Sequence, residues 1–160
     1  MPPPDLFLYS DEFQRIQAIL QRLRQDSSAN VVFLVDKNGQ LIASSGQAQN
    51  LDTTSLASLT AGNVAAMGGL AKLIGEKEFP NQFHEGERES LHMSIVGGRV
   101  VLVVIFDAKS SLGLVRLRVK KAGEELAKVF DVLAKKQAAP GAASPFAEIT
   151  DDDIDNLFSE

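Results

Sequence analysis

The sequence contains no cysteine, no tryptophan and a single tyrosine, and only 6% of its residues are aromatic. Without cysteine, the chain can form neither a disulfide nor a thiolate metal site, and it has no cysteine nucleophile. The longest uninterrupted apolar run is Val100 to Phe106, far shorter than the roughly 20 residues of a membrane-spanning helix. The segment Met1 to Pro4 lacks the basic and apolar regions of a signal peptide. We therefore expect a soluble protein with no membrane partner.

Motifs for catalysis are lacking as well. No P-loop and no G-x-G-x-x-G motif is present to hold nucleotide phosphates. The only histidines, His84 and His92, lack the spacing of a zinc site, and we expect both to be surface or edge-strand residues. Asp36, Asn38 and Gly39 begin like a calcium loop, but the glycine stands too early and no glutamate stands at the twelfth position. We expect no cofactor, no metal and no active site.

The net negative charge of the chain comes from its C-terminal residues. The net charge is −5 at pH 7, and residues 137–160 hold six acidic residues and no lysine or arginine. Removing those six negative charges leaves +1 for the rest of the chain, which gives no reason to expect a nucleic acid partner. Residues 1–9 are proline-rich and residues 137–147 are rich in alanine, proline, glycine and serine, so we predict a flexible N-terminus and a flexible linker. The folded domain is expected at residues 10–136.

The first part of this domain has the pattern of a helix followed by a hairpin. Residues 10–25 place apolar side chains at helical spacing behind a capping serine. Residues 31–36 and 40–45 are typical of strands. Asn38 and Gly39 between them predict a two-residue type I′ turn, in which both residues have positive φ.

The last part of the domain predicts three strands and a helix. Residues 79–90 are charged and contain proline and glycine, which suits an edge strand. Residues 91–96 alternate, Gly97 and Gly98 predict a hairpin turn, and residues 100–106 are apolar throughout, as in a central strand covered on both faces. Residues 110–136 have helical periodicity, although Val115 to Val119 also alternates as a strand would. A strand buried on both faces implies three layers.

Between these parts, Asp52 to Gly75 predicts one long helix with two different faces. One stripe is apolar, and we expect it to face the core: Leu56, Leu59, Met67, Leu70 and Ile74, flanked by Val64 and Leu73. The opposite side carries small residues and one charge: Ala57, Ser58, Ala61, Gly62, Ala65, Gly68, Gly69 and Lys72.

The small face calls for an explanation because each glycine inside a helix costs about 1 kcal/mol relative to alanine. Close approach by another backbone would offset that cost. We predict that this face binds a protein partner. The alternative, packing inside the same subunit, stays open on periodicity alone.

Residues 148–160 form an acidic segment with a small apolar ridge. Asp151 to Asp153 suit the start of a helix, and Ile154, Leu157 and Phe158 follow at spacings of three and four. A helix this short is marginal in water, so we predict a segment that folds on a partner. The alternative is a disordered solubilising tail.

The order of these elements resembles the roadblock family, small α/β domains related to dynein light chains and to regulators of Ras-like GTPases. The resemblance rests on residues 31–46, 55–75 and 99–119 and covers about residues 10–136. It implies the roadblock fold, an α/β sandwich whose five-stranded, mostly antiparallel sheet has one long helix on one face and two helices on the other. The similarity is strongest to bacterial members that act on a Ras-like GTPase in cell polarity and gliding motility.

The same resemblance implies a homodimer in which the two long helices lie side by side and the third strands join the sheets. Two subunits would bind one Ras-like small GTPase and activate it without an arginine finger, by repositioning the catalytic residues of the GTPase itself. The C-terminal segment would bind the GTPase at a second place and tune nucleotide exchange. A cytoplasmic protein concentrated at a cell pole is implied. Two alternatives are a roadblock scaffold without effect on hydrolysis and a small-ligand sensor domain.

Overall fold

The computed structural model describes residues 10–46 and 51–138. In chain order, its elements are α2 (Ser10–Ser27), β1 (Val31–Asp36), β2 (Leu41–Gly46), α3 (Thr53–Leu73), β3 (Asn81–His84), β4 (Ser90–Val96), β5 (Val100–Phe106) and α4 (Leu112–Ala138). Helix α4 ends two residues inside the predicted linker. The predicted N-terminal segment and the C-terminal segment 148–160 lie outside the described residues. None of the described helices is both long and apolar enough to span a membrane.

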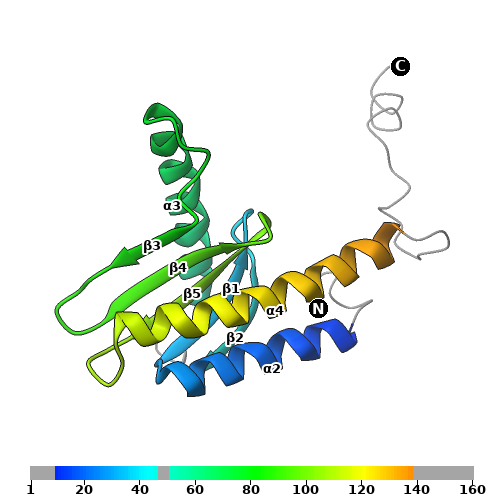
Figure 1. The fold of residues 1–160 in the computed structure, drawn as a ribbon, viewed down its shortest axis with the longest axis horizontal. Helices are drawn as coiled ribbons and strands as arrows, with labels where there is room; N and C mark the ends of the chain where they lie inside the picture. The colour runs from blue at the N-terminus through cyan, green and yellow to red at the C-terminus, as the bar shows by residue number, and fades with distance from the viewer. Residues whose placement is uncertain (1–9, 47–50, 139–160) are drawn as a thin grey trace.

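The sheet is antiparallel throughout, with strand order β2-β1-β5-β4-β3. Helices α2 and α4 cover one face, and α3 lies on the other (Figure 1). Strand β5 is central and almost completely buried, as its uninterrupted apolar sequence predicts. The three layers and the roadblock arrangement expected from the sequence are therefore confirmed.

The sheet divides two apolar clusters of different size. The larger cluster lies under α2 and α4, where Ile16, Leu20 and Leu126 are completely buried among alternate residues of β1 and β5. The smaller one lies on the α3 side and includes Phe33 and Val103. The larger cluster holds α2 and α4 on the sheet, and fewer buried side chains hold α3 on the opposite face.

The β1–β2 turn differs from the predicted type I′ hairpin. Only Gly39 has positive φ, at +91°, and Asn38 does not. The Gly39 N–H donates to the Asp36 carbonyl at 3.1 Å, and the Asp36 N–H donates to the Gln40 carbonyl at 2.9 Å. These bonds define a type I turn followed by a left-handed glycine. The Asp36 side chain selects it by accepting bonds from the Asn38 and Gln40 N–H groups.

Three other local predictions are confirmed. Gly97 and Gly98 both have positive φ and join β4 to β5 as a tight hairpin. Strand β3 lies at the sheet edge. Helix α4 includes the ambiguous residues after Leu112, because Val115 and Val119, four residues apart, are both buried against the sheet.

Candidate protein interaction surface

The long helix begins and ends where its sequence predicts. Asp52 accepts bonds from the Ser55 N–H at 3.0 Å and the Ser55 hydroxyl at 2.6 Å, and these bonds lower the pKa of the Asp52 carboxyl. At the other end, Gly75 has φ +85° and donates its N–H to the Lys72 carbonyl at 3.2 Å. The helix therefore keeps its length even where little packs against it.

The N-terminal half of α3 packs closely on the sheet, whereas in the C-terminal half only Ala71 is buried, at 0% exposed. Ala57 and Thr60 are 1% and 3% exposed, and Ala57 belongs to the smaller apolar cluster. The hairpin turn approaches the same half, because a Cβ added at Gly39 would lie 3.4 Å from the Ser58 Cα. The prediction that Ala57 contacts a partner is wrong, since its methyl group is covered by the sheet.

The predicted core stripe of α3 is confirmed for Leu56 and Val64, which pack against the smaller apolar cluster, and is wrong for the leucines and the isoleucine that are exposed. Leu59 is 72% exposed, Leu73 85% and Ile74 63%. Figure 1 gives the physical reason: the C-terminal part of α3 extends away from the sheet. Helical periodicity identifies an apolar stripe, but it cannot tell whether that stripe faces the core or a second protein.

The exposed apolar side chains align on α3. At about 100° per residue, one line contains Leu59, Ala66, Leu70 and Leu73, all exposed, and we call these four residues the exposed ridge. Isolated exposed leucines are ordinary on protein surfaces, whereas a continuous apolar row marks an interaction site. Sequence reasoning missed this ridge because it had assigned these leucines to the core.

An apolar hollow adjoins the ridge. Its volume is about 540 Å³, and it opens between α3 and strands β3 and β4, with Leu59 and Asn63 on the helix side and Leu91 and Met93 on the sheet side. The Asn63 carboxamide oxygen is buried here without a hydrogen-bond partner among the described residues. The exposed ridge and this hollow adjoin each other, because Leu59 belongs to both.

The three glycines of the small face have no packing role within the subunit. A Cβ added at Gly62, Gly68 or Gly69 would meet no atom within 4 Å. Packing inside the same subunit therefore does not explain why this helix carries glycine. Of the other predicted partner residues, Ser58, Ala65 and Lys72 are exposed and Ala61 is half-buried against the hairpin. Apart from Ala57, the predicted partner-binding set stays a prediction.

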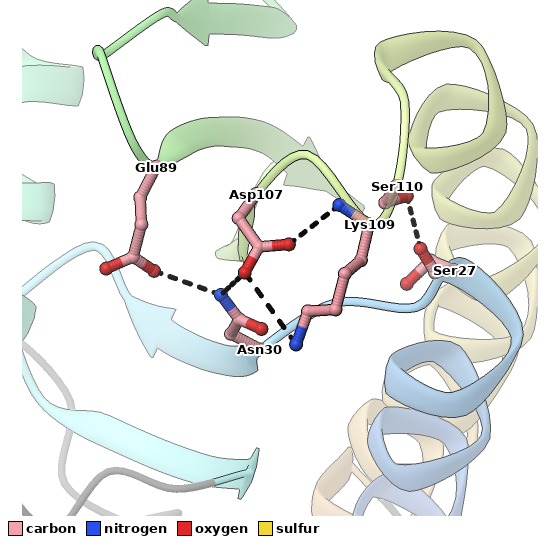
Figure 2. A network of polar contacts seen from close by, with 6 residues as sticks. All are labelled: Ser27, Asn30, Glu89, Asp107, Lys109 and Ser110. Atoms are coloured by element: carbon pink, nitrogen blue, oxygen red, sulfur yellow. Dashed lines mark hydrogen bonds and ion pairs between the residues drawn. The ribbon is translucent and has the colours of Figure 1, made fainter.

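A polar network lies at the ends of β1 and β5, away from this surface (Figure 2). Asn30 donates to Asp107 at 3.0 Å and to Glu89 at 3.2 Å, and the Lys109 N–H donates to Asp107 at 2.9 Å. The bond from Asn30 is the main reason why the pKa of Asp107 is lowered. Because these carboxylates are held by hydrogen bonds between loops, we interpret the network as a structural clamp.

Within residues 10–46 and 51–138, no group of three or more histidine, aspartate or glutamate side chains could hold a metal ion. What the fold does present is an apolar ridge on a projecting helix. This combination defines a protein interaction domain.

Comparison with known families identifies the class. The profile of the Roadblock/LC7 domain matches residues 15–106, and the chain belongs to this family. It is also similar to an uncharacterized protein of Methanocaldococcus jannaschii, at 28% identity over 115 residues, covering 72% of this chain and 96% of that protein.

Solved structures narrow the relationship to MglB proteins. Myxococcus xanthus MglB is 73% identical, with a TM-score of 0.75, and the match covers 77% of this chain and 92% of that one. The gliding protein MglB of Thermus thermophilus is 33% identical, with a TM-score of 0.71 and 76% and 92% coverage. An MglB with a tetrameric arrangement is 32% identical, with a TM-score of 0.72 and the same coverage. The chain is therefore similar to MglB proteins over about three quarters of its length.

Proposed function

We propose that this protein is a GTPase-activating and regulatory partner of a Ras-like small GTPase of the MglA type, acting in cell polarity and gliding motility. The main support for this proposal is the exposed ridge of α3, which lies beside glycines that pack against nothing within the subunit. The chain is also 73% identical to Myxococcus xanthus MglB. A surface of this kind suits a protein partner better than a small ligand, since it lies along a projecting helix.

The functional unit in this proposal is a homodimer. The long helices of two subunits lie side by side through part of the ridge and the glycine positions, and edge strand β3 pairs with its copy. One GTPase binds across the helix pair, so the stoichiometry is two subunits to one GTPase. The solved MglB with a tetrameric arrangement supports association between copies in this group of proteins.

Activation in this proposal works by positioning. The dimer holds the GTPase so that its own arginine and glutamine reach the γ-phosphate. Phosphoryl transfer depends mostly on orientation and charge stabilisation, so a partner without catalytic groups is sufficient. The segment with Ile154, Leu157 and Phe158 lies outside the described residues, and we assign it a second contact with the GTPase.

The test is phosphate release by the cognate Ras-like GTPase, measured in single turnover with and without this protein. Stimulation at a ratio of two subunits to one GTPase supports the proposal. Binding without any change in hydrolysis or in nucleotide exchange would identify a scaffold. Absence of binding would contradict both functions.

A further inference from the structure

A second hollow lies on the opposite side of the sheet from α3, and no step of the proposed function uses it. Its volume is about 550 Å³, and it opens between β4 and the face of α4. We call it the α4 groove and define it by His92 and Ser94 on β4 and Arg116, Lys120 and Gly123 on α4.

Two buried polar residues line the α4 groove. His92 is 2% exposed and Ser94 is 6% exposed. The His92 Nδ1 and the Ser94 hydroxyl oxygen have no hydrogen-bond partner among the described residues. Buried polar atoms in folded proteins nearly always have a partner, so each orphaned atom requires an explanation. Here, two such atoms stand two residues apart on one strand and line the same hollow.

The register of the sheet explains why they share this hollow. His92 pairs with Phe83 of β3 and with Val104 of β5, and both of these side chains belong to the core under α2 and α4. His92 therefore faces α4, and Ser94 does so as well because side chains two apart on a strand share a face.

The groove exists because α4 carries small residues there. Gly123 lines it, and a Cβ added at Gly123 would come within 3.8 Å of the Val96 side chain. The adjoining small position is Ala127. Larger side chains at these two positions would fill the space that now leads to His92 and Ser94.

The rim of the groove is predominantly basic. Arg116 and Lys120 line it from α4, against one acidic residue, Glu124. Burial together with the Arg116 charge lowers the pKa of His92, so its ring is neutral at pH 7 and has one donor and one acceptor nitrogen. A hydroxyl, a neutral imidazole and two cations form a site for a carboxylate flanked by apolar contacts.

We propose that, while no GTPase is bound, the α4 groove binds the acidic C-terminal segment of this chain, with Asp151, Asp152, Asp153 and Asp155 as the anionic groups. The charges are complementary, and Ile154 among the aspartates matches the apolar walls formed by Val96 and Val119. A tethered segment is present at a high effective concentration, which favours it over a free anion.

The chain is long enough to reach. From Lys120 to the end of α4 at Ala138 is about 27 Å, at about 1.5 Å per residue. Residues 139–150 can span up to about 40 Å when extended, at about 3.3 Å per residue. The aspartates can therefore return to the groove along α4.

The experiment uses the full chain without any GTPase, so its outcome is independent of the proposed function. Imidazole ¹⁵N chemical shifts are compared at low salt between the wild type and the variant Asp151→Asn, Asp152→Asn, Asp153→Asn, Asp155→Asn. The signals of His92 are expected to shift, while those of His84, which is exposed on β3, stay in place. High salt is expected to move the wild-type His92 signals toward those of the variant.

A second comparison uses neighbouring lysines. Lys120→Ala is expected to shift the backbone amide signals of Asp151 to Asp155, whereas Lys121→Ala is not, because Lys121 lines a different hollow beside Ile19 and Arg22 of α2. Unchanged His92 signals in the aspartate variant, or unchanged aspartate amides in Lys120→Ala, would overturn the proposal. It would equally be overturned if only added inorganic phosphate moved the His92 signals.

Discussion

Asn30 donates a hydrogen bond from its carboxamide to Asp107 at 3.0 Å, and so ties the residue before β1 to the residue after β5. The Asn30 backbone N–H also donates to the Ile105 carbonyl at 2.9 Å. These two strands are neighbours at the centre of the sheet, and the next loop leads directly into α4. The bond therefore holds the end of α2 and the start of α4 in place over the same face of the sheet.

We expect Asn30→Ala to lower the melting temperature by about 2–4 °C, the shift that about 1 kcal/mol produces in a domain of this size. The physical reason is the loss of two side-chain hydrogen bonds, to Asp107 and to Glu89. Thermal unfolding followed by circular dichroism measures it. Gln14→Ala, at an exposed position of α2, serves as the control. Equal melting temperatures for all three proteins would show that the clamp contributes nothing.

A pH-dependent contribution is expected from Glu12. Its side chain is 3% exposed and pairs with Lys136, whose hydrogen bond is the main reason why the pKa of Glu12 is lowered. A carboxyl with a lowered pKa stabilises the fold above its unfolded pKa of about 4.3, and this contribution is lost as the pH falls through the folded pKa. Glu12→Gln should therefore cost about 1 kcal/mol at pH 7 and nothing near pH 2.

Urea unfolding at both pH values measures the Glu12 effect. The matched control is Asp131→Asn, because Asp131 is exposed on α4. A loss of stability in Glu12→Gln that is the same at both pH values would contradict the ionic origin of the effect.

The sequence predicted the fold well because each element carries its own signal. The central strand is apolar throughout, the segment around the edge strand is charged, and Asp52 and Gly75 mark the two ends of the long helix. The turn at Asn38 was predicted wrongly because an Asn-Gly pair is compatible with two hairpin types. The Asp36 side chain, which accepts two backbone bonds there, decides between them.

The interaction surface could be predicted only in part. Gly62, Gly68 and Gly69 pack against nothing within the subunit, and their contact with a partner stays a prediction. The leucines gave a misleading signal, because a stripe on a helix has the same periodicity whether it faces a core or a partner. Likewise, nothing in the sequence indicated that His92 is buried, since that depends on which strand pairs with β4 and where α4 lies.

A bulky charge on the glycine side of α3 should block partner binding. We expect Gly69→Arg, and likewise Ala65→Arg, to abolish GTPase stimulation, because each places a long cation where two backbones approach closely. Both positions are exposed, so the fold should be retained. The control is Gly113→Arg on α4, which also has no atom within 4 Å of an added Cβ and should keep full stimulation. Full stimulation by both α3 variants would exclude this side of the helix.

No arginine of this protein should supply catalytic charge. Arg88 precedes β4 and Arg99 lies in the turn before β5, and both are exposed. An arginine finger contributes about 10³–10⁵ in rate, whereas loss of a peripheral contact changes the rate by about tenfold or less. Alanine at either position should therefore leave single-turnover hydrolysis within about tenfold of the wild type. A drop of a thousandfold with binding intact would refute activation by positioning.

The exposed ridge provides the sharpest test of the proposed dimer. Leu73 is 85% exposed, so Leu73→Glu should leave the subunit folded while placing a carboxylate inside the interface between two copies. Burying an unpaired charge costs several kcal/mol, and each 1.4 kcal/mol is a factor of ten in affinity. Dimer affinity should fall by at least about a hundredfold. Light scattering at micromolar concentration should then give the mass of one 17.2 kDa chain, where the wild type gives twice that.

Leu117 supplies the matched control, because it is 63% exposed and belongs to α4, which lies on the other side of the sheet from α3 (Figure 1). Leu117→Glu introduces the same charge at a similar exposure and should keep both the dimer and GTPase stimulation. If Leu117→Glu and Leu73→Glu both dissociate the dimer, added negative charge alone accounts for the effect. If neither does, the two subunits do not meet through the ridge, and the exposed leucines must serve another partner.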